Sequence, residues 1–161
     1  MKRMLRVICV FVAAAPLAAN AMAADLKAAD IAGRWQGTTW AREAGGNLTL
    51  DVVACGAGWC GIKVAADDSC GGTALKLDGG AAEGDNIVFK GTLELAPGTA
   101  PYVMQTYLVP ASENSPVALQ IVGDTGGEFR AYRRSFPFEA QMARTRDPVC
   151  HAPQTVSSLA R

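Results

Sequence analysis

The feature that most constrains this chain is a series of short segments in which apolar and polar residues alternate. Alternation with a period of two is typical of β-strands that bury one face. Clusters of Gly, Asn, Asp and Pro, such as residues 45–47, separate the segments and supply the backbone conformations of tight turns. With an opening strand at Gly33, these segments predict an all-β chain that forms a single antiparallel up-and-down β-barrel of about eight strands, or else a sandwich. The alternating segments are residues 48–54, 61–65, 75–77, 87–95, 102–108, 117–121 and 129–133.

The same alternation predicts which side chains face the interior of the barrel. Bulky candidates stand beside small ones, so the sequence leaves open whether the barrel is hollow or filled. The bulky candidates are Phe89, Met104, Leu119 and Phe129, and the small ones are Gly91 and Ala131. Residues 25–32 are expected to form a helical turn or an extended arm, and no long helix is expected after them.

The N-terminal segment has the three parts of a secretory signal peptide. A basic start is followed by an uncharged apolar run, residues 7–24, that ends in small residues. An uncleaved membrane anchor is the alternative, but Pro16 and several alanines make this run a poor one. We predict cleavage after Ala23, or else after Ala21. Removal of residues 1–23 would leave a mature protein in the periplasm or outside the cell.

Four cysteines remain after such a cleavage, and an even number in an exported chain indicates two disulfides. They are Cys55, Cys60, Cys70 and Cys150. Cys55 ends one predicted strand and Cys60 begins the next, so a bridge across this hairpin is within disulfide range. Cys70 then pairs with Cys150 and anchors the C-terminal tail. The alternatives are a bridge from Cys60 to Cys70, and a metal site that uses the thiolates with His151.

The predicted mature chain is one domain, with the barrel at residues 24–147 and a tail at residues 148–161. The whole chain holds 15 basic and 15 acidic residues. Three of the basic residues lie in the signal segment, so the mature protein is mildly acidic. Its basic residues gather only at Arg130, Arg133 and Arg134, which argues against nucleic acid as a partner. No membrane span is predicted after the cleavage site.

The sequence carries no motif that predicts catalysis. His151 is the only histidine, and it lies in a proline-flanked tail beside Cys150, where an exposed residue is expected. The pair Asp67-Asp68 offers oxygen ligands but lacks the spaced acidic residues of a calcium loop, so a solvated turn is expected. The chain has neither a Gly-x-Ser-x-Gly nucleophile elbow nor a phosphate-binding loop. It is therefore predicted to be non-enzymatic, with no catalytic or metal-binding residue and no cofactor.

The first strand opens with Gly33-Arg34-Trp35, directly after a short leader. This opening resembles the Gly-x-Trp start of lipocalin-like (calycin) barrels. The resemblance implies structural roles for Gly33 and Trp35, with Trp35 closing one end of the barrel. It also implies that a basic side chain from a late strand packs over Trp35 in a cation–π contact. The candidates for that contact are Arg130, Arg133 and Arg134.

Two narrower resemblances begin near the same opening. Over residues 31–65, Trp35 followed by Cys55-x4-Cys60-Gly61 is similar to a family of small exported bacterial proteins of unknown function. Residues 28–35 resemble the start of periplasmic metalloprotease inhibitors. Those inhibitors are small disulfide-stabilised barrels whose N-terminal arm enters the protease cleft. Both families are exported, in agreement with the predicted signal peptide.

Two functions follow from these predictions. The first expectation is a hollow barrel that binds a small, partly apolar ligand in its lumen or mouth. The alternative is a filled barrel that acts through its surface and arm on an envelope protein, as a protease inhibitor or an envelope-stress protein does. The sequence does not predict the ligand-binding residues. A cavity lined by inward-facing side chains would favour the first function, and a packed interior the second.

Overall fold

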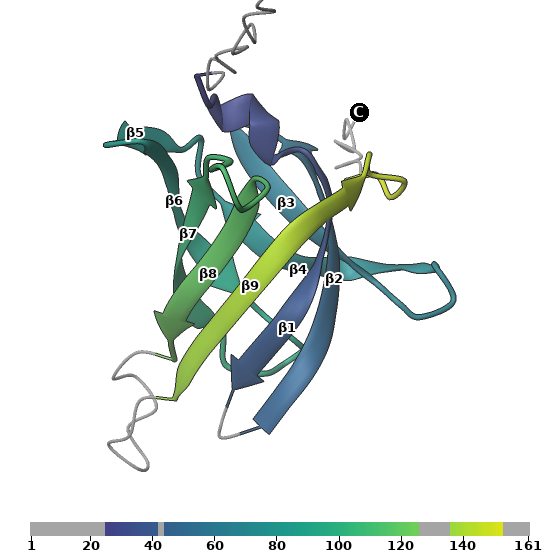
Figure 1. Cartoon of the computed structure of the whole chain (residues 1–161). Coiled ribbons are helices and arrows are strands. Elements are labelled where there is room, and N and C mark those ends of the chain that lie inside the picture. Colours follow the sequence, from purple (N-terminus) through teal and green to yellow (C-terminus); the bar gives the residue numbers. More distant parts are fainter. Residues whose placement is uncertain (1–24, 42–43, 126–135, 153–161) are drawn as a thin grey trace, which may run out of the picture.

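The computed structural model describes residues 25–41, 44–125 and 136–152, which form a nine-stranded antiparallel sheet closed on itself (Figure 1). Eight of the strands make the barrel, and β5 is a short additional strand beside β6. The elements in chain order are η1 (Ala28–Ile31), β1 (Gly33–Ala41), β2 (Ala44–Cys55), β3 (Gly58–Val64), β4 (Cys70–Leu77), β5 (Ala81–Glu83), β6 (Asn86–Leu93), β7 (Tyr102–Val109), β8 (Ala118–Asp124) and β9 (Pro137–Arg146).

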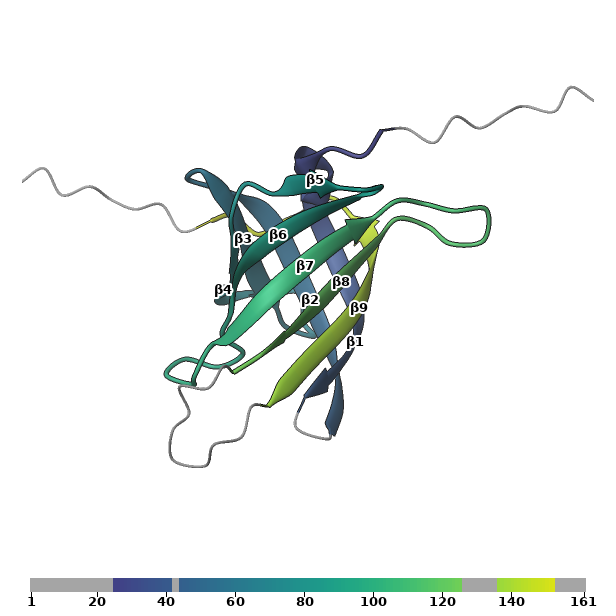
Figure 2. The same ribbon diagram turned by 90° about the vertical axis from the view of Figure 1, so that its left-hand side faces the viewer.

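The barrel strands follow one another around the ring in sequence order. Each pairs with its neighbours along the chain, β4 pairs with β6 past the short β5, and β9 pairs with β1 to close the ring. Figure 2 shows β6, β7, β8 and β9 side by side, with η1 at one end of the barrel. The predicted all-β, up-and-down barrel is therefore confirmed, and the sandwich alternative is wrong.

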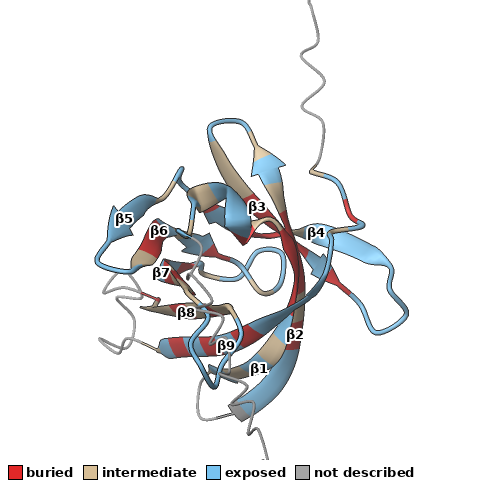
Figure 3. Cartoon of the chain, turned by 45° about the horizontal axis from the view of Figure 1, so that its top comes forward, coloured by how far each residue is buried: buried red, intermediate tan, exposed pale blue. Residues whose placement is uncertain are grey.

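Apolar side chains form one buried cluster inside the barrel. Figure 3 shows how buried and exposed residues are distributed over the strands. Along β7, Tyr102, Met104, Thr106 and Leu108 are buried, and the residues between them are exposed or half-buried. Burying one large apolar side chain stabilises a protein by roughly 1.5–3 kcal/mol, so this interior is the main source of the barrel's stability. The largest fully buried apolar side chains include Trp35, Phe89, Phe138, Leu50, Leu75, Leu93 and Met104.

The 3-10 helix η1 lies at the end of the barrel where β1 begins (Figure 1). The backbone N–H of Lys27 donates to the Asp30 carboxylate at 2.7 Å and closes the turn. Ile31 is fully buried, and its carbonyl accepts the indole N–H of Trp35 at 2.8 Å. This bond satisfies the one polar group that Trp35 takes into the core. Within the described ranges, no helix has the length and apolar character needed to cross a membrane.

Gly91 allows β6 to approach β4 closely at the seam of the barrel. It pairs with Leu77, and a Cβ atom at this position would clash with the backbone carbonyl of Lys76. Glycine within a strand often marks such a close approach of another backbone. The pairing of β4 with β6, which joins the two halves of the barrel, therefore depends on the missing side chain.

The strand assignment differs from the prediction at several places, among them the short β5, which was not predicted. Residues 45–47, expected as a turn, lie within β2, because Ala41 already pairs with Ala44 and the hairpin reverses earlier. Strand β9 has no counterpart among the predicted strands, although its buried residues alternate with exposed ones over most of its length. Its pairing with both β1 and β8 makes it a full member of the barrel. The strand predicted at residues 129–133 lies outside the described residues.

Candidate functional site

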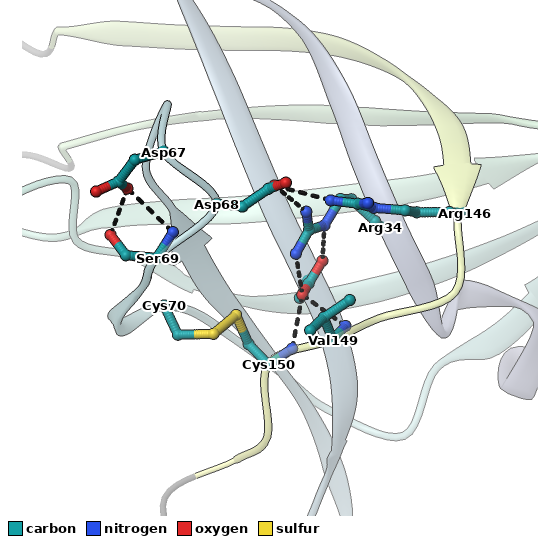
Figure 4. Close-up of a disulfide and its surroundings, with 9 residues drawn as sticks. Arg34, Asp67, Asp68, Ser69, Cys70, Arg146, Val149 and Cys150 are labelled. Carbon is teal, nitrogen blue, oxygen red and sulfur yellow. Dashed lines mark hydrogen bonds and ion pairs between the residues drawn. A yellow bond between two sulfur atoms is a disulfide. The ribbon is translucent and has the colours of Figure 1, made fainter.

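A cluster of polar contacts lies on the outer face of the barrel, where β1 begins and β9 ends (Figure 4). It joins the first two strands, the β3–β4 hairpin and the segment after β9. Its members come from parts of the chain that are far apart in sequence, so the cluster ties those parts together. We call it the arginine clasp, and it consists of Arg34, Asp51, Asp68, Arg146 and the disulfide between Cys70 and Cys150.

Arg34 and Asp51 form a buried ion pair at the centre of the clasp. They are register partners in β1 and β2, and both point away from the core that Trp35 enters. The Nε and Nη2 atoms of Arg34 donate to the two carboxylate oxygens of Asp51 at 2.6 and 2.8 Å, a bidentate geometry. Arg34 is 1% exposed and Asp51 is 0% exposed. The hydrogen bond to Asp51 raises the pKa of Arg34, although burial opposes this, so the guanidinium stays charged.

Asp51 also holds the segment that follows β9. Its Oδ2 atom accepts the backbone N–H groups of Val149 and Cys150, each at 2.8 Å. Burial by itself would raise the pKa of Asp51. The hydrogen bonds from Arg34, Cys150 and Val149 outweigh the burial and lower this pKa to about 2. Asp51 is therefore ionised at neutral pH, and its charge balances that of Arg34 inside the protein.

Asp68, in the turn of the β3–β4 hairpin, completes the clasp from outside. Its Oδ1 atom accepts Nη1 of Arg34 at 2.5 Å and Nη2 of Arg146 at 2.8 Å. The hydrogen bond from Arg146, with a smaller contribution from Arg34, lowers the pKa of Asp68. The Asp68 side chain is still 66% exposed. Its backbone φ of 65° lies in the left-handed region, which residues other than Gly, Asn and Asp rarely adopt.

Both predicted disulfides are present. Cys55 is bonded to Cys60 and Cys70 to Cys150, with a Cα–Cα distance of 5.7 Å in each pair. The alternative bridge from Cys60 to Cys70 is therefore wrong. The bridge to Cys150 spans 80 positions of the chain and fastens the tail to the hairpin. Because the disulfides occupy all four thiols, none of them is available as a metal ligand.

A groove of about 470 Å³ runs beside the clasp, between the β3–β4 hairpin and the outer faces of β1 and β2. Pockets of this size hold small molecules or short segments of a chain. Lys63 also lines the groove, but its ammonium group donates to the carbonyl of Leu95 at 3.4 Å. This contact leaves the positive charge of Lys63 in place, so the groove carries that charge in addition to those of the clasp. The uncharged polar side chains of the lining are Gln36, Asn47, Thr49 and Thr145.

The structure places Gly33 and Trp35 at the start of β1, next to the clasp. Trp35 is fully buried in the core. Arg144 of β9 is the register partner of Trp35, and its side chain lies where a Cβ atom of residue 33 would stand, so a larger residue at position 33 would require the flexible Arg144 side chain to move. The expected partners of Trp35, which are Arg130, Arg133 and Arg134, lie outside the described residues.

Two other candidate residues, His151 and Asp67, are sequence neighbours of Cys150 and Asp68 but are not members of the clasp. His151 is exposed, as expected. Asp67 accepts the hydroxyl and backbone N–H of Ser69 at 2.6 and 3.0 Å, which lowers the pKa of Asp67. Among the residues that the structure describes, no three His, Cys, Asp or Glu side chains are grouped so as to hold a metal ion.

The ion pair of Arg34 and Asp51 has no counterpart among the predicted site residues. One signal for it exists in the sequence, since Asp51 is a carboxylate inside an apolar run, Leu50 to Ala54. A buried charge needs a partner, and that partner is in the preceding strand. The sequence could not name it, because the expected turn at residues 45–47 would have set a different register.

Comparison of the chain with protein-family models, with curated proteins and with solved structures gives no match.

Proposed function

We propose that the protein is an exported, non-enzymatic interaction module that binds a protein partner in the periplasm or outside the cell. The signal-peptide pattern of residues 1–23 supports export. The two disulfides indicate an oxidising compartment, which agrees with it. The groove beside the clasp is the surface that we assign to the partner.

The observation that carries this proposal is the packed interior of the barrel. Trp35 and Phe89 are 0% exposed and Phe138 is 2% exposed, and they belong to one continuous apolar cluster. A barrel that holds a small ligand needs space among its inward-facing side chains. Where those side chains pack against one another, a binding surface is more readily found outside. The groove beside the clasp is such a surface, and its lining is polar and charged.

A small, partly apolar ligand inside the barrel is the second candidate, and Thr106 is the observation that favours it. Among the described residues, its Oγ1 is the one buried side-chain N or O atom without a hydrogen-bond partner. Leaving a buried hydroxyl unpaired costs roughly 1–3 kcal/mol, so a polar group of a bound molecule would be stabilised there. Thr106 pairs with Phe89 and Ile121, both fully buried. One hydroxyl between such neighbours is weaker support than the packed interior.

A lipocalin-like relationship belongs to the same proposal. It is supported by the closed barrel of eight sequential strands and by the Gly33-Arg34-Trp35 opening of β1. It is also supported by the burial of Trp35 beside η1. The resemblance to metalloprotease inhibitors receives less support from the structure. Residues 28–31 fold into η1, and the Ile31 side chain enters the core, so this segment is not a free arm.

Two measurements on protein made in its own host test the proposal. Native mass spectrometry should find the mature chain without a bound small molecule, and a stoichiometric ligand would contradict the proposed interaction function.

A photo-crosslinking residue at Gln36, in the groove, should capture a partner in intact cells. The same residue at Gln105, which is exposed on β7 and does not line the groove, is the matched control. Equal capture at both positions would rule out the groove as the interface.

A further inference from the structure

We propose that the groove beside the clasp is a carboxylate-binding site in which Asp68 occupies the position of a partner's acidic side chain. The inference rests on the proposed interaction function only for the source of that carboxylate. The site itself depends only on the residues of the clasp and the groove.

Two arginine side chains converge on one oxygen atom of Asp68. Nη1 of Arg34 lies 2.5 Å from it and Nη2 of Arg146 lies 2.8 Å from it. Guanidinium groups are well suited to carboxylates because their N–H donors match the planar group. Arg34 is also fixed in place by its bidentate pair with Asp51. The Nη1 atom that contacts Asp68 is therefore held in one orientation, which reduces the entropy that must be lost when another carboxylate binds there.

The charges around the groove also favour a carboxylate. Asp51 balances Arg34, so Asp68 is left to balance Arg146. If the Asp68 side chain turned away, Arg146 would face the groove uncompensated, and Nη1 of Arg34 would lose its acceptor. A carboxylate from outside would restore both interactions without a change in the buried pair.

Asp68 can leave this position without unfolding the hairpin. The turn is held by backbone hydrogen bonds from Asp68 N–H to the Ala65 carbonyl and from Ala65 N–H to the Ser69 carbonyl, both at 3.0 Å. The Asp68 side chain is 66% exposed, so rotation about its own bonds takes it into solvent. The pair of Asp68 with Arg146 is exposed and therefore weak. A carboxylate from outside must still compete with a tethered one, so its affinity for the unmodified protein is low.

The shape of the groove indicates that the incoming carboxylate belongs to a peptide segment. The lining continues from the two arginines to Gln36, Asn47 and Thr49. These side chains offer donors and acceptors that suit the amide groups on either side of an acidic residue. The volume of about 470 Å³ exceeds what a lone carboxylate fills. We therefore assign the site to an aspartate or glutamate within a segment of a partner protein.

The test compares Asp68→Asn with the matched control Asp67→Asn. Asparagine tolerates the left-handed backbone of residue 68, so the first variant should keep the hairpin and remove only the resident carboxylate. NMR titration with acetyl-Gly-Glu-Gly-amide should give saturable shifts of the side-chain N–H signals of Arg34 and Arg146 in Asp68→Asn. The affinity should rise at least about tenfold over the unmodified protein, because the tethered competitor is gone. Asp67→Asn should behave like the unmodified protein.

Three results would overturn the assignment. The first is equal affinity in the two variants, given that the spectra of the free proteins show both to be folded. The second is binding that persists when Arg146→Gln is added to Asp68→Asn. The third is binding of the control peptide acetyl-Gly-Gln-Gly-amide, or of inorganic phosphate in place of the glutamate peptide. The crosslinking test is separate: peptide binding without capture at Gln36 would leave the carboxylate site standing and remove the interaction function.

Discussion

Arg34 and Trp35 are adjacent in β1 and almost equally hidden from solvent, yet different forces bury them. Trp35 points into the barrel, where it belongs to the apolar core. Arg34 points outward, where Asp51 and Asp68 pair with it. Burial on the inner side needs mainly apolar neighbours of the right volume. Burial on the outer side needs particular partners, because a charge without one is costly.

The comparison predicts that substitutions on the two sides of β1 lower the free energy of unfolding for different reasons. Truncation on the inner side leaves a cavity, and its cost scales with the volume lost. Removal of one partner on the outer side leaves an uncompensated charge, which a second change can relieve.

Trp35→Ala should have the largest effect. It should lower the free energy of unfolding by roughly 3–5 kcal/mol, the usual range for an aromatic core residue. Trp40→Ala is the control on the same strand, since Trp40 is 44% exposed and should lose less than about 1 kcal/mol. Urea unfolding of the oxidised proteins measures both. A similar loss for the two variants would show that the inner side is not a specifically packed core.

Asp51→Asn should have the next largest effect. It should lower the free energy of unfolding by roughly 3 kcal/mol, because it leaves Arg34 buried without its counter-charge. The double variant Arg34→Met with Asp51→Leu removes both charges and should be more stable than Asp51→Asn. If the double variant is the less stable of the two in urea, the outer side is held by packing and not by charge compensation.

The same contrast explains which parts of the molecule could be predicted from the sequence. Phe89, Met104 and Leu119, predicted to face inward, are all buried in the core, because alternation along a strand is a local pattern. The pairing of Cys55 with Cys60 is also local to one hairpin.

Apart from its disulfide between Cys70 and Cys150, which was predicted, the clasp could not be predicted. Its ion pairs are set by strand register and by distant chain segments. Asp51 faces Arg34 only because the β1–β2 hairpin reverses before residue 44, earlier than the glycines at 45–46 suggest. Asp68 and Cys150 reach the same place through the fold of the whole barrel. No local pattern in the sequence encodes these distances.

The stability contributed by Asp51, on the outer side of the barrel, should depend on pH. The pKa of Asp51 is about 2, below its ordinary value of 3.8. Its ionised form therefore stabilises the folded state above pH 4, and this contribution is lost as the pH falls from about 4 to about 2. The loss amounts to about 2 kcal/mol by linkage. Asp51→Asn lacks this group, so its stability should fall less over the same range. Equal slopes in urea unfolding at pH 5, 3 and 2 would contradict the role of Asp51.

Thr106→Val should have the smallest effect, with the opposite sign. The hydroxyl of Thr106 is a polar group inside the apolar barrel, and it is buried without a hydrogen-bond partner. Valine has nearly the same shape and suits a strand, so the change should stabilise the protein by about 1 kcal/mol. Thr38→Val is the control, because Thr38 is exposed on β1 and should change stability by less than about 0.5 kcal/mol. If Thr106→Val instead destabilises protein taken from its own host but not refolded protein, the hydroxyl binds a retained molecule. The inner side of the barrel would then be a binding site, and the choice between the two candidate functions would reverse.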